Sequence, residues 1–323
     1  MLTFSLAVLS GFVLLVWGAD RFVAGASATA RNLGVSPLII GLTIVGFGTS
    51  APEILVSGVA STLGNPGLAI GNALGSNITN IALILGVTAL VAPLDVHSDT
   101  LKREFPILLG IMALALLLLL DGELGRIDGL VLLTALGVMI HWMVSLGLKS
   151  RNSDPLGDEY ASELPPEMGM ARALTWLAIG LLVLLFSSRL LVWGAVGIAH
   201  EYGVSDLVIG LTIVAIGTSL PELAAAVVSA LRKEHDIAIG NVIGSNMFNL
   251  LAVLGLPGLI HPGPVAAEVL SRDYPVMIGL TLALFAMAYG LRGPGRINRL
   301  EGLLLFLAFV GYQLTLYFGA VAQ

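Results

Sequence analysis

The sequence contains one segment twice at a constant spacing, and this duplication constrains the fold more than any other feature. Residues 34–86 and 203–255 align without a gap at an offset of 169 residues, and about half of their positions are identical. Each copy reads as two apolar helices that keep a glutamate, hydroxyls and amides in register. Repeats of this kind are a feature of secondary transporters, whose two halves enclose a central site. The sequence therefore predicts two similar half-sites for an ion.

The composition indicates a membrane protein. Hydrophobic residues make up 57% of the chain and charged residues 11%, whereas about a quarter of the residues in soluble proteins are charged. The apolar stretches are nearly continuous and of helical length, unlike the short alternating strands of a barrel. We expect an all-α membrane protein with ten transmembrane helices. They are expected near residues 3–30, 36–62, 68–91, 104–120, 129–148, 173–199, 205–230, 236–260, 274–291 and 300–320.

The distribution of basic residues predicts how the chain crosses the membrane. When the loops are numbered alternately, eleven Lys and Arg residues fall on one side and only Arg126 and Arg272 on the other. The positive-inside rule then places both termini outside the cytoplasm and the polar linker 149–172 inside it. The linker separates two halves, residues 1–148 and 173–323, of five spans each. Because five is odd, the halves enter the membrane in opposite directions, and the repeat is inverted.

A proline and a glutamate interrupt one apolar span in each copy of the repeat. The segments are Thr49-Ser50-Ala51-Pro52-Glu53 and Thr218-Ser219-Leu220-Pro221-Glu222. A proline inside a helix lacks the amide donor and clashes with the carbonyl one turn earlier, so we expect a kink that frees backbone carbonyls. The glutamate follows the two hydroxyl residues by three and four positions, which places all three on one helix face.

The following span of each copy carries a polar stripe. Asn72, Ser76 and Asn80 recur every fourth residue, and Gly71 and Gly75 form a small-residue face that should let another helix approach closely. The second copy repeats the pattern, with Ser245 and Asn249 at the equivalent positions. Packed against the Pro-Glu helices, these stripes would collect hard oxygen ligands near the membrane midplane. Such ligands suit Na⁺ or Ca²⁺ rather than transition metals.

The charge of the two glutamates helps to decide whether they have a structural role or bind an ion. Burying a carboxylate in a membrane costs at least a few kcal/mol, and the four motif spans contain no Lys or Arg to pair with it. A protonated glutamate that bonds a neighbouring helix is one alternative, and a bound cation is the other. Two symmetric copies, each flanked by hydroxyls and amides, favour the cation.

These motifs resemble the two alpha-repeats of the cation/calcium exchanger superfamily, most closely its bacterial sodium/calcium antiporter branch. The resemblance rests on GTSAPE and GTSLPE, followed by GNALGSNITN and GNVIGSNMFN, and covers essentially the whole chain. It implies a multi-pass protein of the bacterial inner membrane that exchanges Na⁺ for Ca²⁺ by alternating access, with the first and sixth helices sliding as a gate. We expect no enzymatic activity, no cofactor, no nucleic-acid partner, and a monomer in the lipid bilayer.

The resemblance also implies a set of ion ligands. Glu53 and Glu222 would be the central carboxylates, and the other side-chain ligands would surround them. These are Thr49, Ser50, Thr218, Ser219, Ser76, Asn80, Ser245 and Asn249, and the backbone carbonyls of Gly46 and Ala215 would complete the sodium sites.

One departure bears on the transported ion. Calcium-transporting relatives often carry an aspartate at a position equivalent to Asn80 or Asn249, whereas this chain has asparagine at both. Two carboxylates neutralise one Ca²⁺ or two Na⁺. Cation/proton exchange is therefore an alternative, as is the transport of Li⁺ or K⁺, and a cation sensor or passive channel is a further one. An intramembrane hydrolase with the two glutamates as an acid/base pair has no supporting His or Ser-His motif.

Overall fold

The described part of the chain is almost entirely helical. The computed structural model describes residues 1–96, 101–150, 168–202, 215–289 and 295–321. The longer helices are α1 (Leu2–Leu33), α4 (Ala51–Thr62), α5 (Pro66–Thr79), α7 (Leu101–Leu119), α8 (Arg126–Ser150), α10 (Met170–Glu201), α13 (Leu220–Leu231), α14 (His235–Phe248), α16 (Tyr274–Tyr289) and α17 (Arg299–Val321). The short helices are α2 (Pro37–Ile40), α3 (Gly46–Thr49), α6 (Gly86–Val91), α12 (Ala215–Thr218) and α15 (Gly255–Ile260). Four π-helical segments are η1 (Gly41–Val45), η2 (Asn80–Leu85), η4 (Asn249–Val253) and η5 (Val269–Asp273).

Several helices are long and apolar enough to cross a membrane. The described residues contain seven such helices, or eight if the bent pair Pro37–Thr49 and Ala51–Thr62 counts as one span. Two shorter apolar helices, Glu104–Leu119 and Leu220–Leu231, lie where two further spans were expected. The first ten residues of the predicted span 205–230 fall outside the described residues, and the rest forms α12 and α13. Membrane-crossing helices are therefore confirmed, while the number ten stays a prediction.

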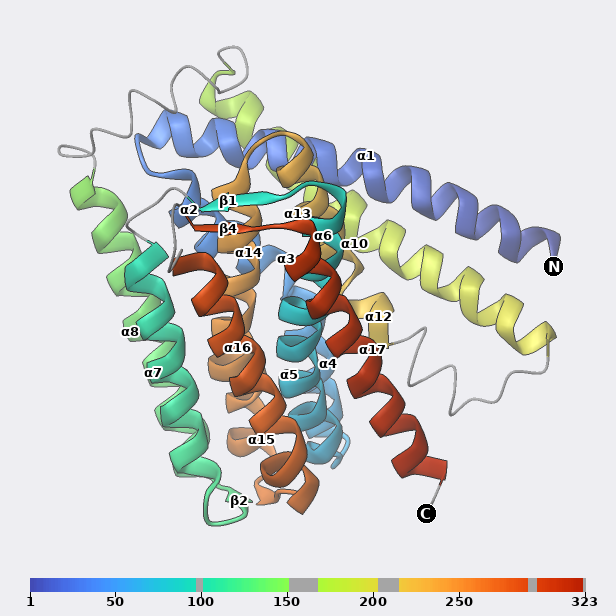
Figure 1. The fold of residues 1–323 in the computed structure, drawn as a ribbon, viewed down its shortest axis with the longest axis vertical. Coiled ribbons are helices and arrows are strands. Elements are labelled where there is room, and N and C mark those ends of the chain that lie inside the picture. Colours follow the sequence, from blue (N-terminus) through green and yellow to red (C-terminus); the bar gives the residue numbers. More distant parts are fainter. Residues whose placement is uncertain (97–100, 151–167, 203–214, 290–294, 322–323) are drawn as a thin grey trace.

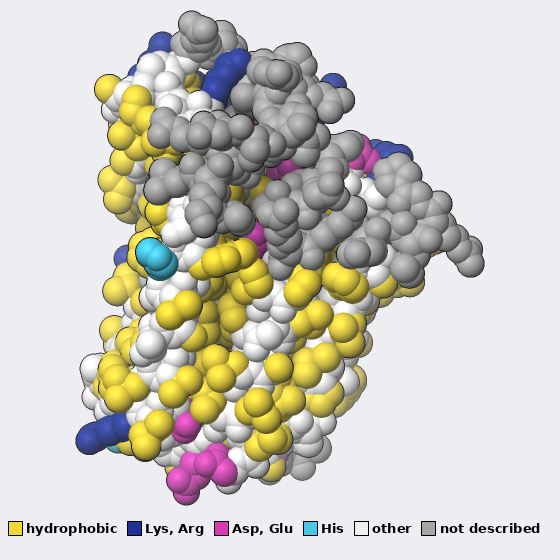
Figure 2. Space-filling model, turned by 90° about the vertical axis from the view of Figure 1, so that its left-hand side faces the viewer, with side chains coloured by type: hydrophobic (Ala, Val, Ile, Leu, Met, Phe, Trp, Pro, Cys, Tyr) yellow, Lys and Arg dark blue, Asp and Glu magenta, His cyan; other side chains and the backbone are white. Residues whose placement is uncertain are grey.

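The two central spans are buried inside the protein. The most apolar stretch of His235–Ile260 is 100% buried, and that of Pro66–Val91 is 78% buried, against 28% for Leu2–Leu33 and for Met170–Glu201. The outer helices turn large hydrophobic side chains outward, as Figure 2 shows for the face formed by α7 and α8, where acidic and basic side chains gather at the lower end. This distribution fits a bundle whose outside contacts lipid and whose inside holds polar groups.

Helices α1 and α10 pack against each other along their length and lie obliquely beside the bundle (Figure 1). Glycines allow the close approach. A side-chain Cβ at Gly25 would lie 2.4 Å from the backbone nitrogen of Leu177, and one at Gly180 would lie 2.4 Å from that of Phe22. Only a residue without a Cβ fits at such contacts. Helix α1 ends at Leu33 and is followed by Gly34, which adopts the left-handed conformation with φ of 64°. Glycine takes this conformation without strain because it has no Cβ.

Two small antiparallel sheets lie at opposite ends of the bundle (Figure 1). Strand β1 (Leu94–Val96), after α6, pairs with β4 (Gly295–Ile297), before α17. Strand β3 (Gly263–Pro264), after α15, pairs with β2 (Glu123–Leu124), before α8. At the offset of 169 residues, β1 corresponds to the start of β3. Each sheet thus joins the end of a central span of one half to the segment that precedes the last long helix, α17 or α8, of the other half.

Candidate functional site: a buried cluster of oxygen ligands

A break in the helix places each central glutamate. Helix α3 ends at Thr49 and α4 begins at Ala51, with Ser50 at φ of −79° and ψ of 1° between them and a bend of 43° across the break. The second copy repeats the break at Ser219, with φ of −91° and ψ of 8°, between α12 and α13. In each copy a proline stands in the first turn of the new helix, where its missing amide hydrogen leaves no helical bond unmade.

The breaks put both carboxyl groups at the start of a helix. Glu53 lies in the first turn of α4 and Glu222 in the first turn of α13. The N-terminal end of a helix carries about half a positive charge, which stabilises a nearby carboxylate. Half a charge at each helix is less than the full negative charge of each glutamate. Some of the charge must therefore be balanced by another group.

The two glutamates of the repeat are buried in the interior and interact with each other. Both side chains are buried, with 1% of their surface exposed. The carboxyl of Glu222 interacts electrostatically with that of Glu53 and lies close to the hydroxyls of Thr49 and Ser50, although Ser50 does not reach hydrogen-bond geometry. Neither glutamate is part of an ion pair with Lys or Arg among the described residues. Two interacting carboxylates in a low-dielectric interior need a proton or a cation to balance their charge.

A hydroxyl and a backbone carbonyl of the first copy contact the central span of the second copy. Thr49 Oγ1 lies 3.0 Å from Asn241 Oδ1 and 3.4 Å from Ser245 Oγ, and Ser245 Oγ lies 3.4 Å from the carbonyl oxygen of Gly46. A Cβ at Gly46 would lie 3.1 Å from the backbone nitrogen of Ser245. Glycine at this position therefore brings the two backbones close enough for the side chains of α3 and α14 to share one cluster.

The close approach predicted for the glycines of the polar stripe is present in the second copy. A Cβ at Gly244 would lie 2.3 Å from the carbonyl oxygen of Leu42, and one at Gly240 would lie 2.8 Å from that of Leu38. The corresponding neighbours of Gly71 and Gly75 would be residues 207 and 211, which lie outside the described residues.

Two of the four described π-helical segments begin at a pair of amides that is repeated in the two copies. Segment η2 begins at Asn80 and η4 begins at Asn249, which are equivalent at the offset of 169 residues. Asn80 donates its side-chain amide to Oδ1 of Asn246 at 3.0 Å across the two central spans. Single π-helical turns in α-helices occur frequently at functional sites, because they rotate the following side chains and loosen the backbone bonds. Nothing in the sequence pattern indicated them.

Six side-chain oxygens in this region are buried without a hydrogen-bond partner among the described residues. They are Oγ of Ser50, both carboxyl oxygens of Glu53, Oε2 of Glu222, and Oδ1 of Asn80 and Asn249. Buried polar atoms are nearly always satisfied, so a group of unsatisfied oxygens indicates a missing partner. Oxygens are acceptors and ligands, and the missing partner is a donor or a cation. Carboxylate, hydroxyl and amide oxygens are the ligand set that Ca²⁺ takes.

The remaining ligands implied by the resemblance are less closely connected. Ser76, Ser219 and Ser245 are buried on α5, at the second helix break and on α14, and Thr218 is half-buried on α12. The structure describes the backbone of Ala215 at the start of α12, but not its side-chain surroundings. Contacts link Thr49 and Gly46 of the first copy to Ser245 of the second, and an electrostatic interaction links Glu222 to Glu53. Asn80 contacts Asn246 of the other central span.

Asn241 and Asn246 were not named among the predicted ligands, although Asn241 is equivalent to Asn72 of the predicted polar stripe, and both contact the site. Asn241 bonds to Thr49 and Asn246 to Asn80. The alignment of GNALGSN with GNVIGSN shows both amides repeated at the offset of 169 residues, at Asn72 and Asn77. That repetition was a usable signal.

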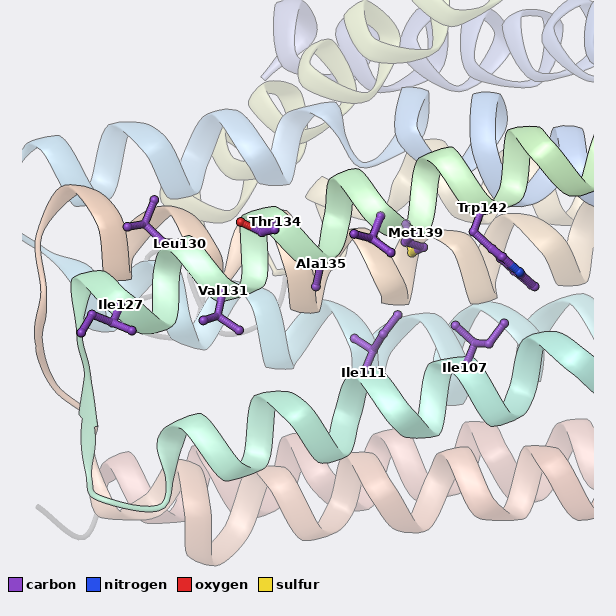
Figure 3. A pocket seen from close by; sticks show the side chains of 10 residues that line it. Ile107, Ile111, Ile127, Leu130, Val131, Thr134, Ala135, Met139 and Trp142 are labelled. Carbon is purple, nitrogen blue, oxygen red and sulfur yellow. The ribbon is translucent and has the colours of Figure 1, made fainter.

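A separate hollow of about 910 Å³ lies between α7 and α8. In Figure 3, Ile107 and Ile111 of α7 point toward α8, and the residues from Ile127 to Trp142 of α8 line the other wall. Apart from Thr134 the lining side chains are apolar or aromatic. This hollow offers no charged ligand and is not the ion site. Nor do the described residues contain a cluster of three or more His, Asp or Glu side chains fit to hold a metal.

Comparison with known proteins places the chain in a family. The family model described as sodium/calcium exchanger protein matches residues 4–144 and 172–318. The chain belongs to the sodium/calcium exchanger family. This family belongs to the cation/calcium exchanger superfamily, and the chain falls in its bacterial branch, as the repeated motifs predicted. Members of this family are membrane antiporters for cations and Ca²⁺.

Several relatives match over nearly their whole length. The chain is 53% identical to a putative antiporter, CaxA, of Alkalimonas amylolytica, covering 98% of this chain and 99% of the relative. It is 44% identical to the inner membrane protein YrbG of Escherichia coli, covering 98% of each. It is 35% identical to the sodium/calcium exchanger MaX1 of Methanosarcina acetivorans, covering 97% and 98%.

Solved structures of the sodium-calcium exchanger NCX_Mj have the same fold as this chain. The form soaked without Na⁺ and Ca²⁺ has a TM-score of 0.84 and 34% identity, covering 98% of this chain and 99% of the other. The form soaked with 2.5 mM Na⁺ and 0.1 mM Ca²⁺ has a TM-score of 0.81 and 35% identity, covering 95% and 96%. The helical membrane fold predicted from the sequence is confirmed at this level.

Proposed function

We propose that the chain is a secondary antiporter that exchanges Na⁺ for Ca²⁺ across the membrane by alternating access. The observation that carries this proposal is the pair of buried, interacting carboxylates, Glu53 and Glu222, together with nearby buried oxygens that have no hydrogen-bond partner among the described residues. In the absence of a basic partner among the described residues, the transported ions supply the balancing charge. Relatives with calcium and sodium in their names support the choice of ions.

The charge of the site suggests how two different ions alternate in it. Two carboxylates balance one Ca²⁺ or two Na⁺, so either occupancy is close to neutral. An unoccupied site keeps two facing negative charges in a low-dielectric interior, which disfavours crossing the membrane without cargo. A bound ion therefore permits the conformational change, and Na⁺ and Ca²⁺ compete for the same carboxylates. Strict exchange follows from this competition.

Each proposed ligand has a role in this scheme. Glu53 and Glu222 provide charge, and the hydroxyls of Thr49, Ser50, Thr218 and Ser219 provide neutral oxygens beside them. Ser76, Asn80, Ser245 and Asn249 line the facing spans, and the carbonyls of Gly46 and Ala215 complete the sodium sites. Ca²⁺ accepts six to eight such oxygens in flexible geometry.

The architecture proposed for this function is ten spans in two inverted halves, residues 1–148 and 173–323, joined by a cytoplasmic linker at 149–172. The two small sheets support it. They lie at opposite ends of the bundle, and each contains the strand that follows a central span, β1 in one half and its equivalent β3 in the other, as expected for an inverted repeat. We further propose a monomer in the bacterial inner membrane with both termini outside the cytoplasm. The relative YrbG is named as an inner membrane protein.

Helices α1 and α10 are proposed to slide as a gate. They contact each other extensively, and both leave most of their apolar surface on the outside of the protein. Helix pairs with small residues at their contact can move together as one body while the central spans stay in place.

The decisive experiment is transport into liposomes that contain the purified protein. Radiolabelled Ca²⁺ uptake is measured first with an outward Na⁺ gradient and then with only a pH gradient, with Li⁺ and K⁺ as competitors. Uptake driven by Na⁺ alone supports the proposal. Uptake driven only by the pH gradient makes the protein a cation/proton exchanger instead. Uptake that does not accelerate when the partner ion is supplied on the opposite side indicates a channel, and the proposal is then wrong.

A further inference from the structure

Asn241 touches both halves of the proposed ion site and is completely buried, at 0% exposure. Its side-chain nitrogen donates to the backbone carbonyl of Glu222 at 3.3 Å, and its Oδ1 lies 3.0 Å from the hydroxyl of Thr49. Glu222 belongs to the second copy of the repeat and Thr49 to the first. A single amide on α14 thus connects the carboxylate-bearing helix of one half with the hydroxyl-bearing helix of the other.

The chemistry of the neighbours fixes the orientation of this amide. A backbone carbonyl only accepts hydrogen bonds, so the NH₂ group of Asn241 must face Glu222. The oxygen then faces Thr49, whose hydroxyl has a proton to donate. Thr49 also has the carbonyl oxygen of Val45 at 3.1 Å in its own helix. Both acceptors draw the hydroxyl proton away, which leaves the lone pairs of Thr49 for a cation.

The first copy repeats half of this arrangement. Asn72 donates its side-chain amide to the carbonyl oxygen of Glu53 at 3.2 Å, and Asn72 and Asn241 each follow their glutamate by 19 residues. Thr218 corresponds to Thr49 at the offset of 169 residues and lies on α12, opposite α5 in the proposed symmetry. The same hydrogen bond, from an asparagine to the carbonyl of the glutamate 19 residues before it, thus occurs in both copies and is part of the repeated architecture of the site.

From these contacts we infer that Asn241, with Asn72 as its counterpart, is a positioning residue that fixes the spacing between the two half-sites and thereby sets the affinity for the transported cation. Neither asparagine is among the proposed ligands. This inference rests on the proposed function. Residues that orient metal ligands through hydrogen bonds change metal affinity by about 10- to 100-fold when they are replaced. Selectivity among cations depends on the size and flexibility of the cavity, so a loosened spacing also weakens discrimination by size.

The test replaces Asn241 by leucine, which has a similar shape and neither hydrogen bond. Equilibrium binding of radiolabelled Ca²⁺ to purified protein is measured together with KM and kcat for Na⁺-driven Ca²⁺ uptake. We expect KM and the dissociation constant to rise about tenfold or more, with a smaller change in kcat, and the preference for Ca²⁺ over Sr²⁺ to decrease. Asn72→Leu should act in the same direction.

The matched control is Ser57→Ala. Ser57 is also fully buried and donates to the carbonyl oxygen of Val253 at 2.6 Å, one turn after Glu53, but it contacts no proposed ligand side chain. This variant should lose stability without a change in KM or in the Sr²⁺ preference. If Asn241→Leu is not recovered in folded form, Asn241→Ala is used. Unchanged ion affinity and selectivity in a folded Asn241 variant would overturn the inference.

A double variant tests whether Asn241 acts through Thr49. If the residues are coupled, the fold-change in affinity of Thr49→Val with Asn241→Leu is less than the product of the two single fold-changes. A full product means independent action and contradicts the inference. If the unmodified protein binds no Ca²⁺ that Na⁺ displaces, the proposed function itself fails, which is a result distinct from the failure of the variants.

Discussion

Replacing Glu222 by glutamine removes one of the two negative charges while keeping an amide oxygen and nearly the same shape. Because Glu222 is 1% exposed, solvent does not replace the missing charge. Removing one member of a buried charge pair typically costs about 3–5 kcal/mol, and each 1.4 kcal/mol changes an affinity about tenfold. The apparent affinity for Ca²⁺ should therefore fall by roughly 10²- to 10⁴-fold, and Na⁺-driven uptake at low Ca²⁺ should become undetectable. Glu53→Gln should behave in the same way.

The assay is Na⁺-driven uptake of radiolabelled Ca²⁺ into liposomes over a wide range of Ca²⁺ concentrations. Asp273→Asn is the matched control, because Asp273 is also a buried acid in a span. It is paired with Arg272 at 2.7 Å and accepts from Tyr312 at 3.0 Å, outside the proposed site. We expect the control to lose stability and to retain ion affinity. If Glu222→Gln folds and its Ca²⁺ affinity stays within about threefold of the unmodified protein, which is less than 1 kcal/mol, the charge argument is refuted.

Three further predictions concern other parts of the structure. In Gly180→Leu, the new Cβ would lie 2.4 Å from the backbone nitrogen of Phe22. We expect thermal unfolding to show a loss of about 1–3 kcal/mol in stability, and flux measurements to show slower exchange with unchanged Ca²⁺ binding. Asn249→Asp adds a third carboxylate, and competition binding should show a shift in favour of Ca²⁺ over Na⁺. Arg232→Ala breaks the partly exposed ion pair with Asp20 and should lower the free energy of unfolding by at most about 1 kcal/mol. A larger loss of stability in thermal unfolding would contradict this prediction.

The positions of the helices could be read from the sequence because local composition decides them. The apolar stretch 236–260 became the helical run His235–Ile260, and the stretch 3–30 became Leu2–Leu33. The break before Pro52 was also predictable, since a proline in an apolar span cannot continue the hydrogen-bond ladder. The π-helical turns at Asn80 and Asn249 were not, because nothing in the residue pattern of these spans distinguishes a π turn from an α turn.

The oxygen ligands could be nominated from the sequence, but their mutual contacts could not. Repetition at a fixed offset identified Glu53 and Glu222. Because their spans contain no Lys or Arg to pair with a carboxylate, the sequence also indicated that a cation balances their charge. The contacts of Asn241 with Thr49 and with the backbone of Glu222 depend on how two helices of different halves are rotated about their axes. Helix rotation is set by packing at small residues such as Gly46 and Gly244, which sequence periodicity alone does not resolve.

Equilibrium binding of radiolabelled Ca²⁺ to the purified protein, with Na⁺ as competitor, tests most directly whether Glu53 and Glu222 share the transported ions. We predict about one Ca²⁺ for each chain, since two carboxylates balance one divalent charge, displacement by Na⁺ with a Hill coefficient above one, and no binding to the Glu53→Gln, Glu222→Gln double variant. Ca²⁺ binding that Na⁺ does not displace, or that survives the loss of both carboxylates, would contradict the account.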